Sequence, residues 1–202
     1  MGNQLNLLTF RASQTKSMHR IKVDNYVSID ASDTVGIGTS NPSKDGWVPK
    51  FALLISAEQT INLGRSGTTI REAIHQQLPK VFNYKPNVIT ICYTSNLNEM
   101  LSQLRNKLGN DTRILVGNIP DLSQVNIYTS LGIPKLLPTL QIKRWNDAIK
   151  QIVKKNQCDL VDLYSHWKEL SEHPEYISFY GFYLSTHGYE RLAQIFYQQY
   201  LK

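Results

Sequence analysis

Apolar residues in this chain fall into short β-type runs separated by longer stretches with helical spacing. Five runs rich in β-branched residues predict strands, at 26–30, 60–64, 88–92, 113–117 and 159–163. The run 88–92 has the composition of a central strand that is buried on both faces, which is typical of a parallel sheet.

Helices are expected between these strands, over 47–57, 69–78, 97–108, 139–156 and 186–201. The fourth carries one apolar stripe, made of Ile142, Trp145, Ile149, Ile152 and Val153. Ser185 is a suitable N-cap for the last helix. The proline-containing stretch 118–137 predicts a long loop, and long loops in compact domains are often functional. Alternating strands and helices predict a three-layer α/β/α sandwich around a five-stranded parallel sheet.

Composition limits the class of protein. With 202 residues, 41% hydrophobic and 19% charged, the chain can bury a core as one domain. Only two cysteines are present, far apart, so neither a disulfide scaffold nor a zinc site is expected and a reducing, cytoplasmic location is the default. No apolar run is long enough for an integral membrane segment.

The net charge of +6 comes mostly from the first 23 residues. This stretch contains four basic residues and no acidic one, which leaves only +2 for the remainder. We therefore expect a basic, loosely ordered leader at 1–23, a single domain at 24–202 and no nucleic-acid partner. The leader could alternatively contact acidic partners or anionic lipid. Its short apolar stretch at 5–10 and the lack of a following small-residue cleavage site make it a poor secretory signal.

Candidate chemistry lies in the loops that follow the strands, where open α/β sheets hold their ligands. Ser32 follows the first strand, and a serine at a strand-to-helix turn is either a nucleophile or a turn cap. The glycines after the second strand allow a backbone N–H to approach a ligand. Asn96 follows the third strand and could direct its amide at an oxyanion. Turn chemistry accounts equally well for each residue taken alone.

The order of these blocks along the chain resembles the SGNH/GDSL hydrolase family. The matching blocks are 30–38 (Asp-Ala-Ser-Asp-Thr-Val-Gly-Ile-Gly), 62–67 (Asn-Leu-Gly-Arg-Ser-Gly), 116–122 (Val-Gly-Asn-Ile-Pro-Asp-Leu) and 185–189 (Ser-Thr-His-Gly-Tyr). The resemblance runs from about residue 26 to residue 201. It implies a flavodoxin-like sandwich, a serine esterase, lipase or deacylase acting on a small-molecule ester, and no cofactor or metal. The substrate is left open, since this scaffold serves lipids, acetylated sugars and thioesters.

The resemblance also assigns roles to residues. Ser32 becomes the nucleophile, and the backbone N–H groups of Ser32 and Gly67 with the Asn96 side chain become the oxyanion hole. Removing one such donor typically costs about 10²–10³ in turnover.

Two tyrosines stand where the family has its catalytic acid and base. The family carries Asp and His three residues apart before the last helix, and this chain has Tyr180 and Tyr183 there. An unperturbed tyrosine has a pKa near 10 and stays protonated at neutral pH, so it cannot accept the serine proton. Asp30 replaces the usual glycine, which adds a negative charge that would oppose an oxyanion, and Leu97 replaces an acidic residue.

Several alternatives follow from these replacements. His187, four residues after Tyr183, is the nearest histidine that could replace the base, or else a solvated residue at a helix start. An aromatic rim could stack on a sugar or acyl group or simply pack the loop; it comprises Tyr176, Phe179, Tyr180, Phe182 and Tyr183. The sequence therefore predicts either an impaired serine ester hydrolase or an inactive pseudoenzyme that binds a small acyl or sugar ligand or a protein partner.

Overall fold

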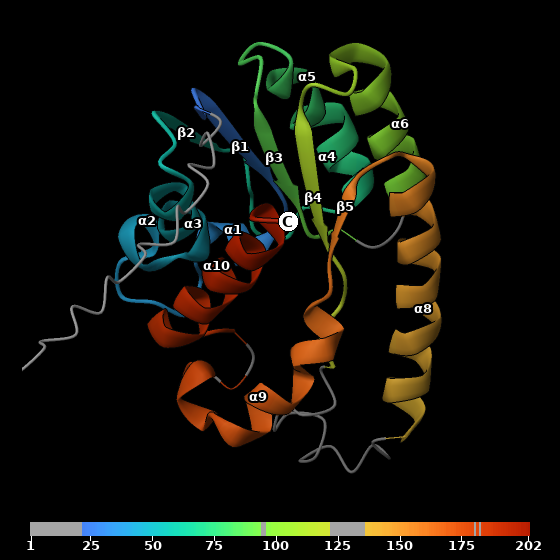
Figure 1. Ribbon diagram of the computed structural model, residues 1–202. Coiled ribbons are helices and arrows are strands. Elements are labelled where there is room, and N and C mark those ends of the chain that lie inside the picture. The colour runs from blue at the N-terminus through green and yellow to red at the C-terminus, as the bar shows by residue number, and fades with distance from the viewer. Residues whose placement is uncertain (1–21, 94–95, 122–135, 180, 182) are drawn as a thin grey trace, which may run out of the picture.

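A five-stranded parallel sheet runs through the centre of the molecule (Figure 1). The computed structural model describes residues 22–93, 96–121, 136–179, 181 and 183–202. The strands are β1 (Asn25–Ile29), β2 (Gln59–Asn62), β3 (Val88–Ile91), β4 (Arg113–Gly117) and β5 (Asp159–Val161). Their order is β2-β1-β3-β4-β5, so β1 pairs with β2 on one side and β3 on the other. This is the flavodoxin-like order, and it confirms the predicted fold class.

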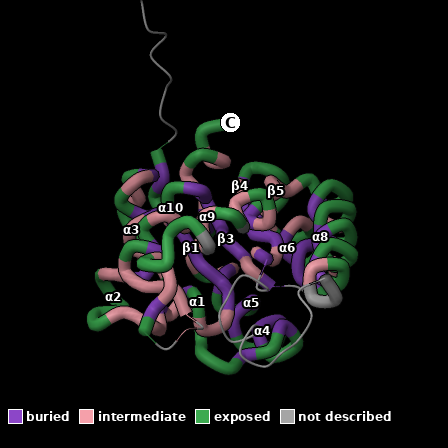
Figure 2. Tube along the Cα trace, turned by 90° about the horizontal axis from the view of Figure 1, so that it is seen from below, coloured by how far each residue is buried: buried purple, intermediate pink, exposed green. Residues whose placement is uncertain are grey.

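Helices cover both faces of the sheet. One layer contains α4 (Ile70–Gln76), α5 (Leu78–Val81), α6 (Leu97–Leu108) and α8 (Leu136–Lys155), and the other contains α3 (Trp47–Ile55) and α10 (Thr186–Tyr200). Shorter elements are α1 (Ser32–Val35), α2 (Pro42–Asp45), α9 (Trp167–Glu172) and the 3₁₀ turns η2 (Leu163–His166) and η3 (Pro174–Tyr176). Alternate residues of the strands pack into the two cores on opposite faces of the sheet. The strands are accordingly buried along much of their length (Figure 2).

Aromatic rings fill the core beneath α3 and α10. Trp47 stacks on Phe196 with ring centroids 4.5 Å apart, and Phe51 meets Tyr26 of β1 edge-on at 5.2 Å. All four side chains are fully buried. Burial of large aromatic surfaces is the main stabilising contribution on this face.

Arg113 fixes the end of the last helix against the sheet. Its Nε donates to the Asp159 carboxylate at 2.7 Å, and its other nitrogens donate to the carbonyl oxygens of Gln199 and Tyr200. The guanidinium also lies 5.1 Å from the centre of the Tyr200 ring. One side chain therefore ties β4 to β5 and to the C-terminal turn of α10.

Some helix boundaries differ from the expectation. The helix expected over 69–78 ends at Gln76 and is followed by α5, because Pro79 has no N–H to continue the ladder. The helix expected from 139 starts earlier, at Leu136, inside the expected loop. Of that loop, residues 122–135 lie outside the described part of the chain. Ser185 caps α10 as predicted, accepting from the Gly188 N–H at 3.2 Å.

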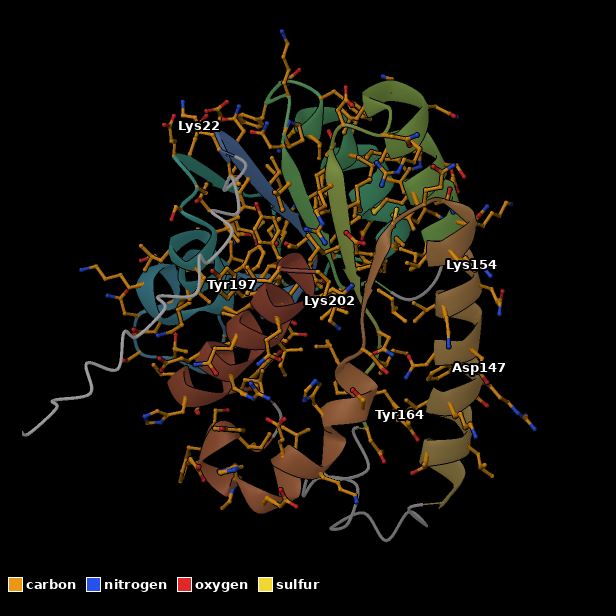
Figure 3. All side chains as sticks on the ribbon, in the orientation of Figure 1. Lys22, Asp147, Lys154, Tyr164, Tyr197 and Lys202 are labelled. Atoms are coloured by element: carbon orange, nitrogen blue, oxygen red, sulfur yellow. The ribbon has the colours of Figure 1, made fainter. Side chains whose placement is uncertain are left out.

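The first described residues lie beside the amino-terminal ends of the strands. Lys22 pairs with Asp24 at 2.8 Å and Glu58 at 3.1 Å, and Val23 is buried. Figure 3 shows Lys22 at the opposite end of the sheet from Tyr164, which follows β5. The rest of the expected leader, residues 1–21, lies outside the described residues. Within the described residues, no helix is both long enough and apolar enough to cross a membrane.

Replacing Phe196 by alanine tests the aromatic core. Phe196→Ala removes a fully buried ring that stacks on Trp47, so we expect a loss of about 3–5 kcal/mol in the free energy of unfolding. Urea denaturation followed by circular dichroism measures this loss. Phe179→Ala makes the same change at an exposed position and should leave stability nearly unchanged. Equal effects of the two substitutions would contradict this description of the core.

Candidate active site

Ser32 lies at a sharp turn between β1 and α1. The strand ends at Ile29 and the short helix begins at Ser32, which is half-buried. The Thr34 hydroxyl donates to the Ala31 carbonyl at 3.0 Å. Gly36, with φ +82°, ends the helix. This turn is the strand-to-helix elbow that the sequence predicts around a nucleophilic serine.

The loop after β2 is held tightly against this elbow. The Asn62 amide donates to the Thr34 carbonyl at 2.5 Å, and the Arg65 N–H donates to the Asp30 carbonyl at 3.2 Å. A Cβ on Gly64 would lie 1.8 Å from the Thr34 hydroxyl oxygen, so only glycine permits this approach. The contact brings the following turn, which contains Gly67, to the same side of the sheet as Ser32. Gly67 has φ +74° and open space where a side chain would be.

Asn96 begins α6 after β3. Its backbone is left-handed, with φ +48°, and its exposed side chain does not cap its own helix. Since β2, β1 and β3 are neighbours, the loops that carry Gly67, Ser32 and Asn96 leave the same edge of the sheet side by side. The topology thus brings the three predicted residues to one edge, and their catalytic roles stay predictions.

Tyr183 packs directly against the elbow. A Cβ on Gly38 would lie 2.9 Å from the Tyr183 Cβ and 2.5 Å from the Leu184 carbonyl oxygen. The Tyr189 hydroxyl of α10 also donates to the Ile37 carbonyl at 2.8 Å. The segment before α10 therefore packs against the loop that follows α1, and the assignment of Tyr183 to the family's base position stays a prediction. Tyr180 lies outside the described residues.

His187 is exposed in the first turn of α10 and lies near Glu175. Hydrogen bonds from the Glu175 backbone and from His173 lower the pKa of the Glu175 carboxyl, and His187 adds a smaller electrostatic contribution. The sequence left open whether His187 serves as a base or is a solvated residue, and its exposure favours the second reading.

Asp30 is buried beneath the elbow, with 3% of its surface exposed. The Ala31 N–H donates to its carboxyl group, and Oδ2 has no hydrogen-bond partner among the described residues. Burial, and to a lesser degree the nearby Asp33, raises the pKa of Asp30 to about 8. The carboxyl is thus mostly neutral at pH 7, so it does not supply the fixed negative charge that the sequence led us to expect.

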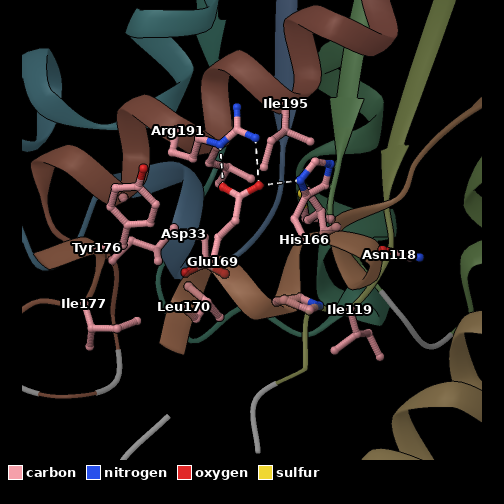
Figure 4. A pocket seen from close by; sticks show the side chains of 16 residues that line it. Asp33, Asn118, Ile119, His166, Glu169, Leu170, Tyr176, Ile177, Arg191 and Ile195 are labelled. Carbon is pink, nitrogen blue, oxygen red and sulfur yellow. Dashed lines mark hydrogen bonds and ion pairs between the residues drawn. The ribbon is translucent and has the colours of Figure 1, made fainter. Parts of the chain in front are cut away.

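A cavity of about 300 Å³ lies between the sheet edge, α9 and α10 (Figure 4). Glu169 of α9 binds Arg191 of α10 through both carboxylate oxygens, at 2.5 and 2.8 Å. His166 contacts the same carboxylate through Nδ1 at 2.7 Å. Hydrogen bonds from Arg191, supported by His166, lower the pKa of Glu169 to about 2. The wall of the cavity therefore carries a closed, charge-neutralised network.

Sequence reasoning did not find this cluster. The i, i+3 spacing of His166 and Glu169 is a visible signal, but Arg191 joins only through the packing of α9 against α10. Elsewhere, Asp162, which directly follows β5, accepts a hydrogen bond from the Asn118 amide at 2.7 Å. Among the described residues, no group of three or more His, Cys, Asp or Glu side chains forms a metal-binding cluster.

The strand order and the two helical layers define a three-layer α/β/α protein with the SGNH hydrolase fold. More specifically, the chain belongs to the GDSL-like lipase/acylhydrolase family, whose pattern matches residues 31–191. This confirms the resemblance seen in the sequence.

Solved structures share this fold at low sequence identity. A lipase/acylhydrolase from Enterococcus faecalis is 17% identical with a TM-score of 0.65, and the match covers 87% of this chain and 94% of that one. A catalytic mutant of an acetylxylan esterase from Geobacillus stearothermophilus is 15% identical with a TM-score of 0.68, covering 89% and 95%. TesA is 13% identical with a TM-score of 0.68, covering 87% and 97%. No curated protein matches the sequence significantly.

The buried carboxyl of Asp30 predicts a stability that depends on pH. The native carboxyl holds its proton up to pH about 8, whereas an unfolded aspartic acid releases it near 3.8. Native protein therefore binds more protons in this window, and its stability falls as pH rises from 4 to 8, by at most about 1.4 kcal/mol per pH unit. Asp30→Asn removes this proton, so its stability relative to wild type should grow through the window and level off above pH 8.

Thermal melts of both proteins between pH 4 and 9 measure this difference. Asp111→Asn, at an exposed position, is the control and should follow the wild-type curve. A constant difference between Asp30→Asn and wild type across the range would show that Asp30 is ionised when folded.

Proposed function

We propose that this chain is an SGNH-type serine ester hydrolase in architecture whose turnover is strongly impaired. Ser32 is the nucleophile, and the N–H groups of Ser32 and Gly67 with the Asn96 amide form the oxyanion hole. The observation that supports the proposal is the packing of Tyr183 against Gly38, in the loop that follows α1, because the resemblance to the family puts the catalytic base at the position of Tyr183. The protein would act in the cytoplasm on a small-molecule ester.

The chemical step explains why this replacement matters. As the Ser32 oxygen attacks the ester carbonyl, its proton must pass to a base, and later a proton must reach the leaving alcohol. A tyrosine hydroxyl with an ordinary pKa near 10 already holds its proton at pH 7 and cannot take another. The oxyanion hole and substrate binding alone leave a residual ~10³–10⁴-fold advantage over water.

His166 comes from a different part of the sheet from the family's base. It follows β5, and β3 and β4 lie between β5 and β1. Its Nδ1 is also engaged by Glu169. The family's arrangement, in which the base approaches Ser32 from the segment before α10, is therefore not reproduced by this residue.

The second candidate function is that of a pseudoenzyme that binds a small acyl or sugar ligand or a protein partner. The cavity of about 300 Å³ favours it, because a space large enough for a small molecule persists beside the altered site. The two candidates share the fold and differ in whether Ser32 turns over an ester.

Hydrolysis of p-nitrophenyl acetate by the native protein and by Ser32→Ala separates them. We expect a slow native rate, because no base activates the serine, and we expect that rate to fall to background in Ser32→Ala. Equal rates for the two proteins would favour the pseudoenzyme. A native rate greater by orders of magnitude would contradict the impairment. His187→Ala, with His75→Ala as a control on an exposed histidine of α4, would then test the remaining candidate base.

Restoring the family's residues should recover activity. We expect Tyr180→Asp combined with Tyr183→His, with Asp30→Gly added if needed, to raise kcat/KM by about 10²–10⁴, the usual contribution of a positioned acid–base group. The same variant carrying Ser32→Ala should return to background. A restored variant that folds, as shown by its thermal melt, yet stays inactive would overturn the assignment of these two positions.

A further inference from the structure

The cavity behind the elbow extends across most of the sheet. Its lining includes residues that follow four strands: Asp33 after β1, Cys92 after β3, Asn118 after β4 and Leu163 after β5. From β1 to β5 is three strand spacings, or roughly 14 Å. The space is therefore elongated, and its shape suits an extended chain better than a compact ring.

The walls along this length are apolar. They are built from Ile119, Leu163, Leu170, Ile177, Leu184, Leu192 and Ile195. Most of the polar groups that reach the cavity are already paired. The Asn118 amide donates to Asp162 and its oxygen accepts from the Tyr164 N–H, while Glu169 is satisfied by Arg191 and His166.

The carboxylate of Asp33 is the exception among the lining charges. Arg191 uses its Nε and one Nη on Glu169, so this positive charge is cancelled within the wall. No cation pairs with the Asp33 side chain among the described residues. Although the residue as a whole is partly open to solvent, burial of its carboxyl group raises the pKa of Asp33, so an ammonium group beside it would favour the ionised form. Asp33 is therefore the acidic side chain of the lining that has no cationic partner among the described residues, and it lies at the β1 end.

We propose that this cavity binds a hydrophobic cation, a straight aliphatic chain that ends in an ammonium group. The chain lies along the leucine and isoleucine walls, and the ammonium lies beside Asp33. Apolar burial provides affinity that grows with chain length, and the carboxylate selects the charge of the head group. A fatty carboxylate of the same length would bring a second negative charge to Asp33. This binding does not require Ser32 to be active.

Calorimetric titration of the intact protein with hexylamine, octylamine and decylamine, each below its micelle concentration, tests the proposal. We expect binding to tighten roughly tenfold for every two methylenes. Octanol should bind about tenfold more weakly than octylamine, and octanoate more weakly still. Butylamine, which has the length of a lysine side chain, is titrated in the same way. If its affinity exceeds that of the longer amines, the proposal of a long aliphatic ligand is wrong.

Two variants locate the site. Asp33→Asn should weaken the binding of octylamine about tenfold and leave the binding of octanol unchanged. Asp111→Asn, the same change at a remote exposed position, should alter the affinity for neither ligand. Leu192→Trp, checked for folding by its thermal melt, should abolish the binding of octylamine and of octanol, because the larger side chain fills the cavity. If octanoate binds as tightly as octylamine, or if Asp33→Asn leaves octylamine unaffected, the proposal is wrong. Because Ser32→Ala should bind octylamine normally, this result is independent of any ester turnover.

Discussion

The close approach of two segments to the chain that follows β1 determines the arrangement of the carboxyl edge. Gly64 brings the β2 loop within reach of Thr34, and Gly38 lets the Tyr183–Leu184 segment lie against the loop after α1. Neither contact leaves room for a side chain on the glycine. Because these contacts are so close, the turn that carries Ser32, the β2 loop and the segment before α10 are held in fixed relative positions.

Burial, more than the identity of a residue, decides which charges this edge carries. Asp30 replaces a small neutral residue of the family pattern, yet its carboxyl is removed from water and holds its proton near neutral pH. Glu169 shows the opposite case, because Arg191 keeps it ionised. Asp33 lines the cavity without a cationic partner among the residues that the structure describes, and burial raises the pKa of its carboxyl. The electrostatics of the site therefore follow from solvent access and pairing, which the sequence does not display.

The sequence predicted the parts of the structure that depend on local pattern. The boundaries of β4 agree with the run 113–117, since an unbroken apolar stretch has few alternatives once it is buried on both sides. The parallel order then brings the loops of Ser32, Gly67 and Asn96 to one edge. The short helix α9 and the Glu169–Arg191 pair were missed, because a six-residue helix is held by tertiary contacts. The cavity could not be predicted from the sequence either, since its walls come from segments far apart in the chain.

The position of α10 also has a consequence for the way this protein is made. On the face of the sheet that α3 covers, the core is completed by Phe196, and the Tyr189 hydroxyl donates to a carbonyl 152 residues earlier. The Arg113 side chain likewise donates to the carbonyl oxygen of Tyr200, which follows it by 87 residues. A chain that has been synthesised only as far as β5 therefore lacks the Phe196 ring that packs on Trp47 and Phe51. The α3 face can acquire its native core only after α10 has been synthesised.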